Sequence, residues 1–198
     1  MGVTGTVTHD LQGLEARLRL HPKELLAADL RTKNRTAAST RTEAVRRLRP
    51  EFGSLKAGTI RRQIKLVRAT PGTPRAILEF SAKRFRLFGN YGGSQTKTGV
   101  RIGRLPWRIE ALDGDVVPPQ ALAHAFIQRG RMSGVPNVWI RTGTKRYSIT
   151  ALLASSLASA FKVGGLGAGL VSFGRSRYRV VFAQEMKFRV SKRLSRGD

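Results

Sequence analysis

The sequence contains no cysteine, and acidic residues and histidines are scarce in it. Its 198 residues include 12 Asp and Glu and three His. Without cysteine the chain can form neither a disulfide framework nor a thiolate metal site, and such a composition fits synthesis and assembly in the cytoplasm. His9, His21 and His124 lie far apart, with none of the spacings of metal ligands, so no metal site is expected.

Sequence patterns that indicate catalysis are missing as well. Asp113 and Asp115 flank Gly114, which predicts a tight turn rather than a calcium site or an acid/base pair. The serines lack the nucleophile-elbow pattern of serine hydrolases. The Gly-rich segment 164–169 lacks the Gly-Lys-Ser/Thr ending of a P-loop and follows an expected helix, so it is interpreted as a hinge or mobile loop. We therefore expect no catalytic residues and no cofactor, and the chain is not expected to be an enzyme.

One stretch needs to be tested as a membrane span. Residues 151–171 carry a single charge, Lys162, over about the 20 residues that cross a bilayer. The stretch consists largely of Ala, Ser and Gly, and its charge lies near the middle, which favours a buried helix over residues 151–162 followed by a Gly-rich loop over residues 163–176. The N-terminus has no basic segment followed by an apolar one, as a signal peptide would. No membrane span is expected.

Positive charge is the strongest feature of the composition. The 37 Lys and Arg give a net charge of +25, and 27 of these residues are Arg. A chain this basic attracts polyanions or acidic protein surfaces. The excess of Arg favours binding over solubility alone, because the planar guanidinium matches phosphate and carboxylate groups.

The N-terminal third predicts two helices with a basic exterior. A long helix is expected over residues 23–49 and a shorter one over residues 55–67, where Ile60, Ile64 and Val67 recur at helical spacing. Their basic side chains predict a patch that faces DNA or pairs with a protein partner, with a solvated surface as the third interpretation. The patch comprises Arg41, Arg46, Arg47, Arg49, Arg61, Arg62, Lys65 and Arg68.

The middle of the chain predicts a small antiparallel sheet. Strands are expected over residues 76–80, 85–88, 100–102 and 107–109, and two apolar runs at 125–127 and 138–140 flank a cluster of turn formers. A further short strand is expected over residues 147–149. The predicted core of this central hairpin comprises Phe126, Ile127, Val138, Trp139, Ile140, Tyr147 and Ile149.

The C-terminal residues 177–194 predict a basic helix that buries Tyr178, Val181, Phe182 and Phe188, with a strand over residues 178–182 as the alternative. The expected fold class is therefore α+β. A long N-terminal helix and a short basic helix would pack on a small antiparallel sheet, with further helices at the C-terminus. One domain is expected over residues 1–198, and it stays open whether residues 1–21 form an N-terminal arm.

Four segments of the sequence resemble the minor tail protein Z family of long-tailed bacteriophages. Residues 34–39 (NRTAAS) are similar to that family's Asn-Arg segment, which is rich in Ala and Ser, and residues 61–69 (RRQIKLVRA) to its basic helix. Residues 125–128 with 138–141 are similar to its two strands, and residues 145–149 (KRYSI) to its Arg-aromatic segment, with Ala160 and Phe161 at the following helix end. The likeness covers residues 23–162. Ser148 departs from it, because a proline is common at this position, and so does the segment 154–156, which replaces a turn containing Gly and Pro.

The resemblance implies a virion structural protein of the tail-completion type, with residues 1–198 as a single tail-completion domain. Such a protein is expected to assemble in the host cytoplasm as a homo-oligomeric ring, expected to be a hexamer, at the neck of the virion. Its implied partners are the tail terminator or tail tube, the head–tail connector and the genomic DNA in the conduit. The alternatives are a free-standing basic nucleic-acid-binding protein and another component of a phage tail or baseplate.

Overall fold

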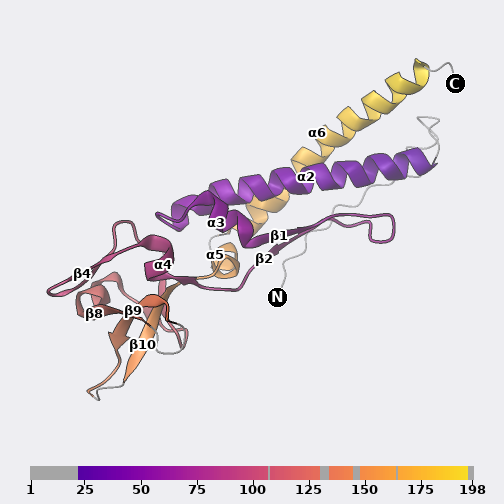
Figure 1. The fold of residues 1–198 in the computed structure, drawn as a ribbon. Coiled ribbons are helices and arrows are strands. Elements are labelled where there is room, and N and C mark those ends of the chain that lie inside the picture. The colour runs from indigo at the N-terminus through magenta and orange to yellow at the C-terminus, as the bar shows by residue number, and fades with distance from the viewer. Residues whose placement is uncertain (1–21, 107, 130–133, 145–147, 164, 196–198) are drawn as a thin grey trace. The chain divides into compact units, whose positions relative to one another are not determined.

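The protein is described here from a computed structural model, which places residues 22–106, 108–129, 134–144, 148–163 and 165–195 (Figure 1). Contacts divide these residues into two compact units. The first unit comprises residues 22–44, 64–80 and 165–195, and the second comprises residues 45–63 and 81–163. The single domain expected from the sequence thus takes the form of two units. The segment 1–21, for which an arm was considered, lies outside the described residues.

The long N-terminal helix is confirmed as α2 (Pro22–Glu51). Pro22 suits the first turn of a helix because its missing N–H would have no partner there. Glu24 in the first turn and Arg49 in the last turn both have the sign of charge that the helix dipole favours. Gly53, with a φ of 60°, follows the end of the helix. Such a left-handed conformation is easy for glycine and strained for other residues.

The first unit combines α2 with a β-hairpin and the C-terminal helix α6 (Leu166–Leu194). The hairpin consists of β1 (Ile64–Val67) and β2 (Ile77–Phe80), which pair antiparallel with Ile64 opposite Phe80. The helices α2 and α6 lie side by side (Figure 1). Apolar side chains from both of them form the core of this unit, which comprises Leu25, Ala28, Tyr178, Phe182 and Met186, with Val190 packed against it.

The predicted second helix over residues 55–67 is wrong beyond Arg62. The observed helix α3 covers Ala57–Arg62, and β1 begins at Ile64. Gly58 weakens the helix, since glycine is about 1 kcal/mol less favourable there than alanine. Ile64 is buried, Lys65 is exposed, and the four residues of β1 pair with β2, which fixes this segment as a strand.

The second unit contains a six-stranded antiparallel sheet. Its strand order is β7-β6-β10-β9-β8, and β3 also pairs with β10. The bounds are β3 (Phe85–Arg86), β6 (Ile109–Ala111), β7 (Val116–Val117), β8 (Ala125–Arg129), β9 (Pro136–Arg141) and β10 (Ile149–Ala154). The remaining elements of the unit are α3, α4 (Leu87–Tyr91), the two-stranded pair β4 (Ser94–Thr96) and β5 (Gly99–Arg101), the 3-10 helix η1 (Pro119–His124) and α5 (Leu157–Val163).

The central hairpin is confirmed. Phe126 of β8 lies opposite Trp139 of β9, and Ile127 lies opposite Val138. Val138 is fully buried, and the indole of Trp139 donates a hydrogen bond to the carbonyl of Gln128 at 3.0 Å. Of the remaining predicted core residues, Ile140 in β9 and Ile149 in β10 are partly buried, and Tyr147 lies outside the described residues.

Two predictions for the C-terminal third are wrong in part, although residues 157–162 are helical as expected. The helix expected over residues 151–162 is instead the strand β10, followed by α5, because the run from Ile149 to Ala154 pairs with β9 along one part and with β6 and β3 along the other. The loop expected over residues 163–176 is helical from Leu166 onward. A Cβ on Gly174 would lie at an ordinary contact distance of 3.5 Å from the hydroxyl of Thr40, so α6 packs against α2 at this position.

The basic C-terminal helix is confirmed, and Tyr178, Val181 and Phe182 are buried on it as expected. Phe188 is 55% exposed, which corrects the prediction of its burial. The expected strand over residues 85–88 gives way to α4 after Arg86. Within the described residues, no helix is long and apolar enough to cross a membrane. The elements together give the α+β class expected from the sequence.

Candidate functional site

The predicted basic patch is distributed over three elements. Arg41, Arg46, Arg47 and Arg49 lie on α2, and Arg61 and Arg62 lie exposed on α3. Lys65 belongs to the strand β1 and pairs with Glu79 of β2 at 3.3 Å, and Arg68 follows that strand. The patch was expected on a helical hairpin, and this geometry is wrong for Lys65 and Arg68. Arg41, Lys65 and Arg68 belong to the first unit and the other five residues to the second.

A different cationic cluster is built around Glu185 in the first unit. The carboxylate of this α6 residue accepts a hydrogen bond from Nη1 of Arg35 at 2.8 Å, and Nη1 of Arg31 lies 3.8 Å from its other oxygen. The Glu185 side chain is 7% exposed, whereas those of Arg31 and Arg35 are 59% and 54% exposed. A buried carboxylate therefore holds two arginines that extend into solvent.

Asp29 forms a second buried polar contact between α2 and α6. Its carboxylate accepts a hydrogen bond from the hydroxyl of Tyr178 at 2.6 Å and another from the ammonium of Lys33 at 2.6 Å. Burial raises the pKa of Tyr178, and the hydrogen bond to Asp29 and its negative charge act in the same direction. The tyrosine therefore stays protonated and remains a hydrogen-bond donor to the carboxylate.

Asn34 connects α2 to the β-hairpin of the same unit. Its side-chain amide donates a hydrogen bond to the carbonyl of Ala69 at 3.0 Å, and its Oδ1 accepts one from the amide of Ala69 at 2.7 Å. A single side chain thus satisfies both backbone groups of a buried residue just beyond β1. The contact fixes where the hairpin meets the helix.

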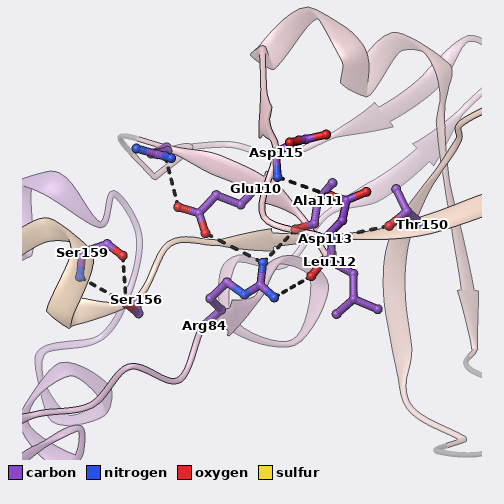
Figure 2. Close-up of polar contacts among 10 residues, drawn as sticks. Arg84, Glu110, Ala111, Leu112, Asp113, Asp115, Thr150, Ser156 and Ser159 are labelled. Carbon is purple, nitrogen blue, oxygen red and sulfur yellow. Dashed lines mark hydrogen bonds and ion pairs between the residues drawn. The ribbon is translucent and has the colours of Figure 1, made fainter. Parts of the chain in front are cut away.

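Glu110 is the centre of a polar network in the second unit (Figure 2). Its carboxylate lies 3.1 Å from Nε of Arg108 and 3.8 Å from Nη1 of Arg84. Arg84 also donates hydrogen bonds of 2.7 Å to the carbonyls of Ala111 and Leu112. These contacts secure the end of β6 where the chain turns, so the network has a structural role.

Asp113 and Ser156 also have structural roles. The tight turn at Asp113 is confirmed, because its Oδ1 accepts a hydrogen bond from the amide of Asp115 at 3.3 Å (Figure 2). The hydroxyl of Ser156 accepts one from the amide of Ser159 at 3.1 Å, which caps the start of α5. Within the part of the chain that the structure describes, no group of three or more His, Asp or Glu could hold a metal ion.

A shallow apolar cleft of about 260 Å³ lies in the second unit. Its lining comprises Pro106, Arg108, Ile109, Val116, Val117, Pro118 and Pro119. Its one charged lining residue, Arg108, already pairs with Glu110. The lining therefore supplies neither a nucleophile nor a general base.

The cluster of Arg31, Arg35 and Glu185 was not predicted from the sequence. Arg31 and Arg35 lie one helical turn apart, which is visible in the sequence, but their common partner is 150 residues beyond Arg35. Glu185 is the sole acidic residue in the sequence of α6. A single carboxylate in a basic helix was the one feature of the sequence that could have indicated a basic partner for it. Comparison with protein-family models, curated proteins and solved structures gives no match.

Proposed function

We propose that this chain is a structural protein of a bacteriophage virion, similar to the minor tail protein Z family. In this role it completes the tail, assembles as a ring at the head–tail junction, and lines or gates the passage through which DNA leaves the head. Its partners are further copies of itself, the tail terminator or tail tube, and the head–tail connector. The role requires binding and assembly and no covalent catalysis.

The contact between Asn34 and Ala69 carries the proposal. These residues belong to two of the segments that resemble the family, and they are 35 residues apart in the sequence. Two of the segments that carry the resemblance therefore meet in the folded chain through two hydrogen bonds. The paired strands β8 and β9 contain the third resembling segment, which gives the same kind of support.

The charge supports a position beside packaged DNA. The described residues of the first unit include 15 Lys and Arg against five Asp and Glu, and α6 alone has seven basic residues against one acidic. A ring with this composition favours a polyanion in its channel.

The decisive experiment is a map of the head–tail junction at side-chain resolution, from particles of a phage that encodes this chain. We expect density for the chain in a fixed, symmetric copy number at the neck. Without the chain, we expect heads and tails that do not form infectious particles. Normal, infectious particles that lack the chain would contradict the proposal.

The second candidate function is a free-standing nucleic-acid-binding protein, which the net charge of +25 favours. A free binder would shift duplex DNA in a gel at moderate salt as a monomer of 21.8 kDa. A ring component would instead co-purify with tails or necks. Light scattering of the purified protein, together with fractionation of infected cells, distinguishes the two functions.

A further inference from the structure

The two arginines on Glu185 are spaced and exposed in a way that suits a repeating anion. Arg31 and Arg35 lie four residues apart on α2, which corresponds to about 6 Å along the helix axis. More than half of each side chain is exposed. Both guanidinium groups therefore present donors to solvent from the same face of one helix.

Glu185 holds Arg35 by a hydrogen bond and lies within ion-pair distance of Arg31 before any ligand arrives. Its carboxylate contacts one nitrogen of each guanidinium, at 2.8 Å for Arg35 and 3.8 Å for Arg31. A guanidinium has five N–H donors, so most of them remain for a ligand. Ordering the side chains in the free protein reduces the entropy that binding would otherwise lose. Glu185 is thus a positioning residue for the two arginines.

The surroundings of the arginine pair favour phosphate over a protein surface. Along α2, the exposed positions one helical turn to either side of the pair are Ala27 and Ala38; on α6, Phe188 is exposed three residues beyond Glu185. The cores of protein interfaces are enriched in aromatic residues and methionine and depleted of charge. The small side chains instead let a phosphate backbone approach the helix.

We propose that Arg31 and Arg35, positioned by Glu185, bind neighbouring phosphates of double-stranded DNA. One DNA strand offers a phosphate every 3.4 Å of helix axis, a spacing that lets two guanidinium groups about 6 Å apart contact the same strand. The planar fork of arginine matches a phosphate better than a lysine ammonium does. This inference rests on the proposed function, for which it names the residues that contact DNA.

The test measures the affinity of the full chain for a fluorescent duplex of random sequence over a series of NaCl concentrations. Replacing both arginines (R31Q/R35Q) should lower the slope of log K against log[NaCl] by about 2, since each lost phosphate contact removes about 0.9 from it. The matched control R177Q/K187Q removes the same charge from exposed positions of α6 in the same unit and should keep the slope.

Two further variants separate positioning from charge. The double variant R31K/R35K keeps both positive charges, so it can still pair with Glu185 even if R31Q/R35Q fails to fold. It removes only the planar guanidinium groups with their paired donors, and we expect it to bind DNA about fivefold more weakly than the wild type. The variant E185Q raises the net charge by one. A diffuse cationic surface would then bind DNA more tightly, whereas loss of positioning weakens binding.

The inference is overturned if R31Q/R35Q and R177Q/K187Q change the slope equally, or if E185Q binds more tightly than the wild type. It is also overturned if R31Q/R35Q loses affinity for polyglutamate but not for DNA, which would indicate an acidic protein partner. If the chain is found in tail particles but R31Q/R35Q leaves the slope unchanged, the proposed function holds and the inference about Arg31 and Arg35 is wrong. If instead R31Q/R35Q lowers the slope but the chain is absent from tail particles, the DNA contact through Arg31 and Arg35 holds and the proposed tail function is wrong.

Discussion

Two buried carboxylates, Asp29 and Glu185, connect α2 to α6 in the first unit. Each has partners of opposite charge or a hydrogen-bond donor on the neighbouring helix, which is the condition for burying a charge without a large loss of stability. Apolar packing alone would let two long helices slide along each other. The polar contacts require particular atoms to meet, so they select one register of the two helices.

The Tyr178 hydroxyl should contribute to stability in a manner that depends on pH. The substitution Y178F leaves Asp29 with Lys33 as its remaining partner in the described structure, and we expect a loss of about 1–3 kcal/mol in the free energy of unfolding near neutral pH. Burial raises the pKa of Tyr178 above the ordinary value near 10. The folded state therefore keeps the proton after the unfolded state has lost it, so this contribution is complete below about pH 10 and declines above it.

The measurement for Tyr178 is denaturant unfolding of the wild type and Y178F at pH 8, 10 and 11. The difference in unfolding free energy between the two proteins should narrow as the pH rises. Tyr91, whose pKa burial also raises, is present in both proteins, so its effect cancels. Curves that stay parallel across this range would contradict the assignment.

Asn34 should be a second large contributor at the scale of a single residue. The substitution N34A removes both hydrogen bonds to the backbone of Ala69 and leaves that buried amide and carbonyl unsatisfied. We expect a loss of about 2–4 kcal/mol in unfolding free energy and faster hydrogen exchange at the Ala69 amide. N34D keeps the acceptor for the Ala69 amide but turns a carboxylate oxygen toward the Ala69 carbonyl in place of the donor, so we expect it to be destabilised as well. Equal stability of N34A and the wild type would contradict this account.

At the scale of whole elements, local patterns predicted the long helix and the strands that a short turn joins. The long helix α2 and the hairpin β8–β9 are of this kind, because their amphipathic spacing and turn residues suffice. The run from Ile149 to Ala154 is apolar without a clear period, so it suits a helix or a central strand. Pairing with β6, which lies about 40 residues earlier, decides in favour of the strand.

In the candidate site too, features that depend on neighbouring residues could be predicted, and features that depend on contacts between residues far apart in the sequence could not. The exposure of Arg46, Arg49, Arg61 and Arg62 on helices follows from the local pattern. The strand that contains Lys65 depends on β2, and the cluster at Glu185 depends on a contact across 150 residues. A single sequence carries no record of such contacts, so the strongest cationic geometry of the first unit was not predicted.

Two glycines with differently crowded surroundings, Gly174 and Gly53, test the packing of the helices. In the middle of α6, G174A should stabilise the protein by up to about 1 kcal/mol, because the new methyl group would lie at an ordinary 3.5 Å from Thr40. After α2, G53A should destabilise it by more than about 1 kcal/mol, because φ is +60° and the new Cβ would lie 2.6 Å from the carbonyl oxygens of Arg104 and Leu105. Thermal unfolding of both variants gives the comparison, and a loss of stability in G174A would contradict the packing described for α6.

At the scale of the whole molecule, the chain has 37 basic and 12 acidic residues and a net charge of +25, so repulsion between like charges outweighs attraction on average. Raising NaCl from about 0.05 to 0.3 M shortens the Debye length to less than half, which screens this repulsion. We therefore expect Tm to rise with salt over this range. The sugar sucrose, which leaves charge unscreened, is the control for the general effect of added solute. A falling Tm would mean that the attractive pairs, such as those at Glu185, outweigh the repulsion.

The pairing of α2 with α6 also constrains how the chain is made. The ribosome synthesises α2 early, but the helix that shields Leu25 and Ala28 is the last of the described elements to emerge from the exit tunnel. Throughout translation, the nascent chain exposes this face of α2 while residues 81–163 are already available to fold. A premature stop codon before Tyr178 would leave α2 permanently uncovered. Such truncated products should be targets for chaperones and proteases even though most of the polypeptide is intact.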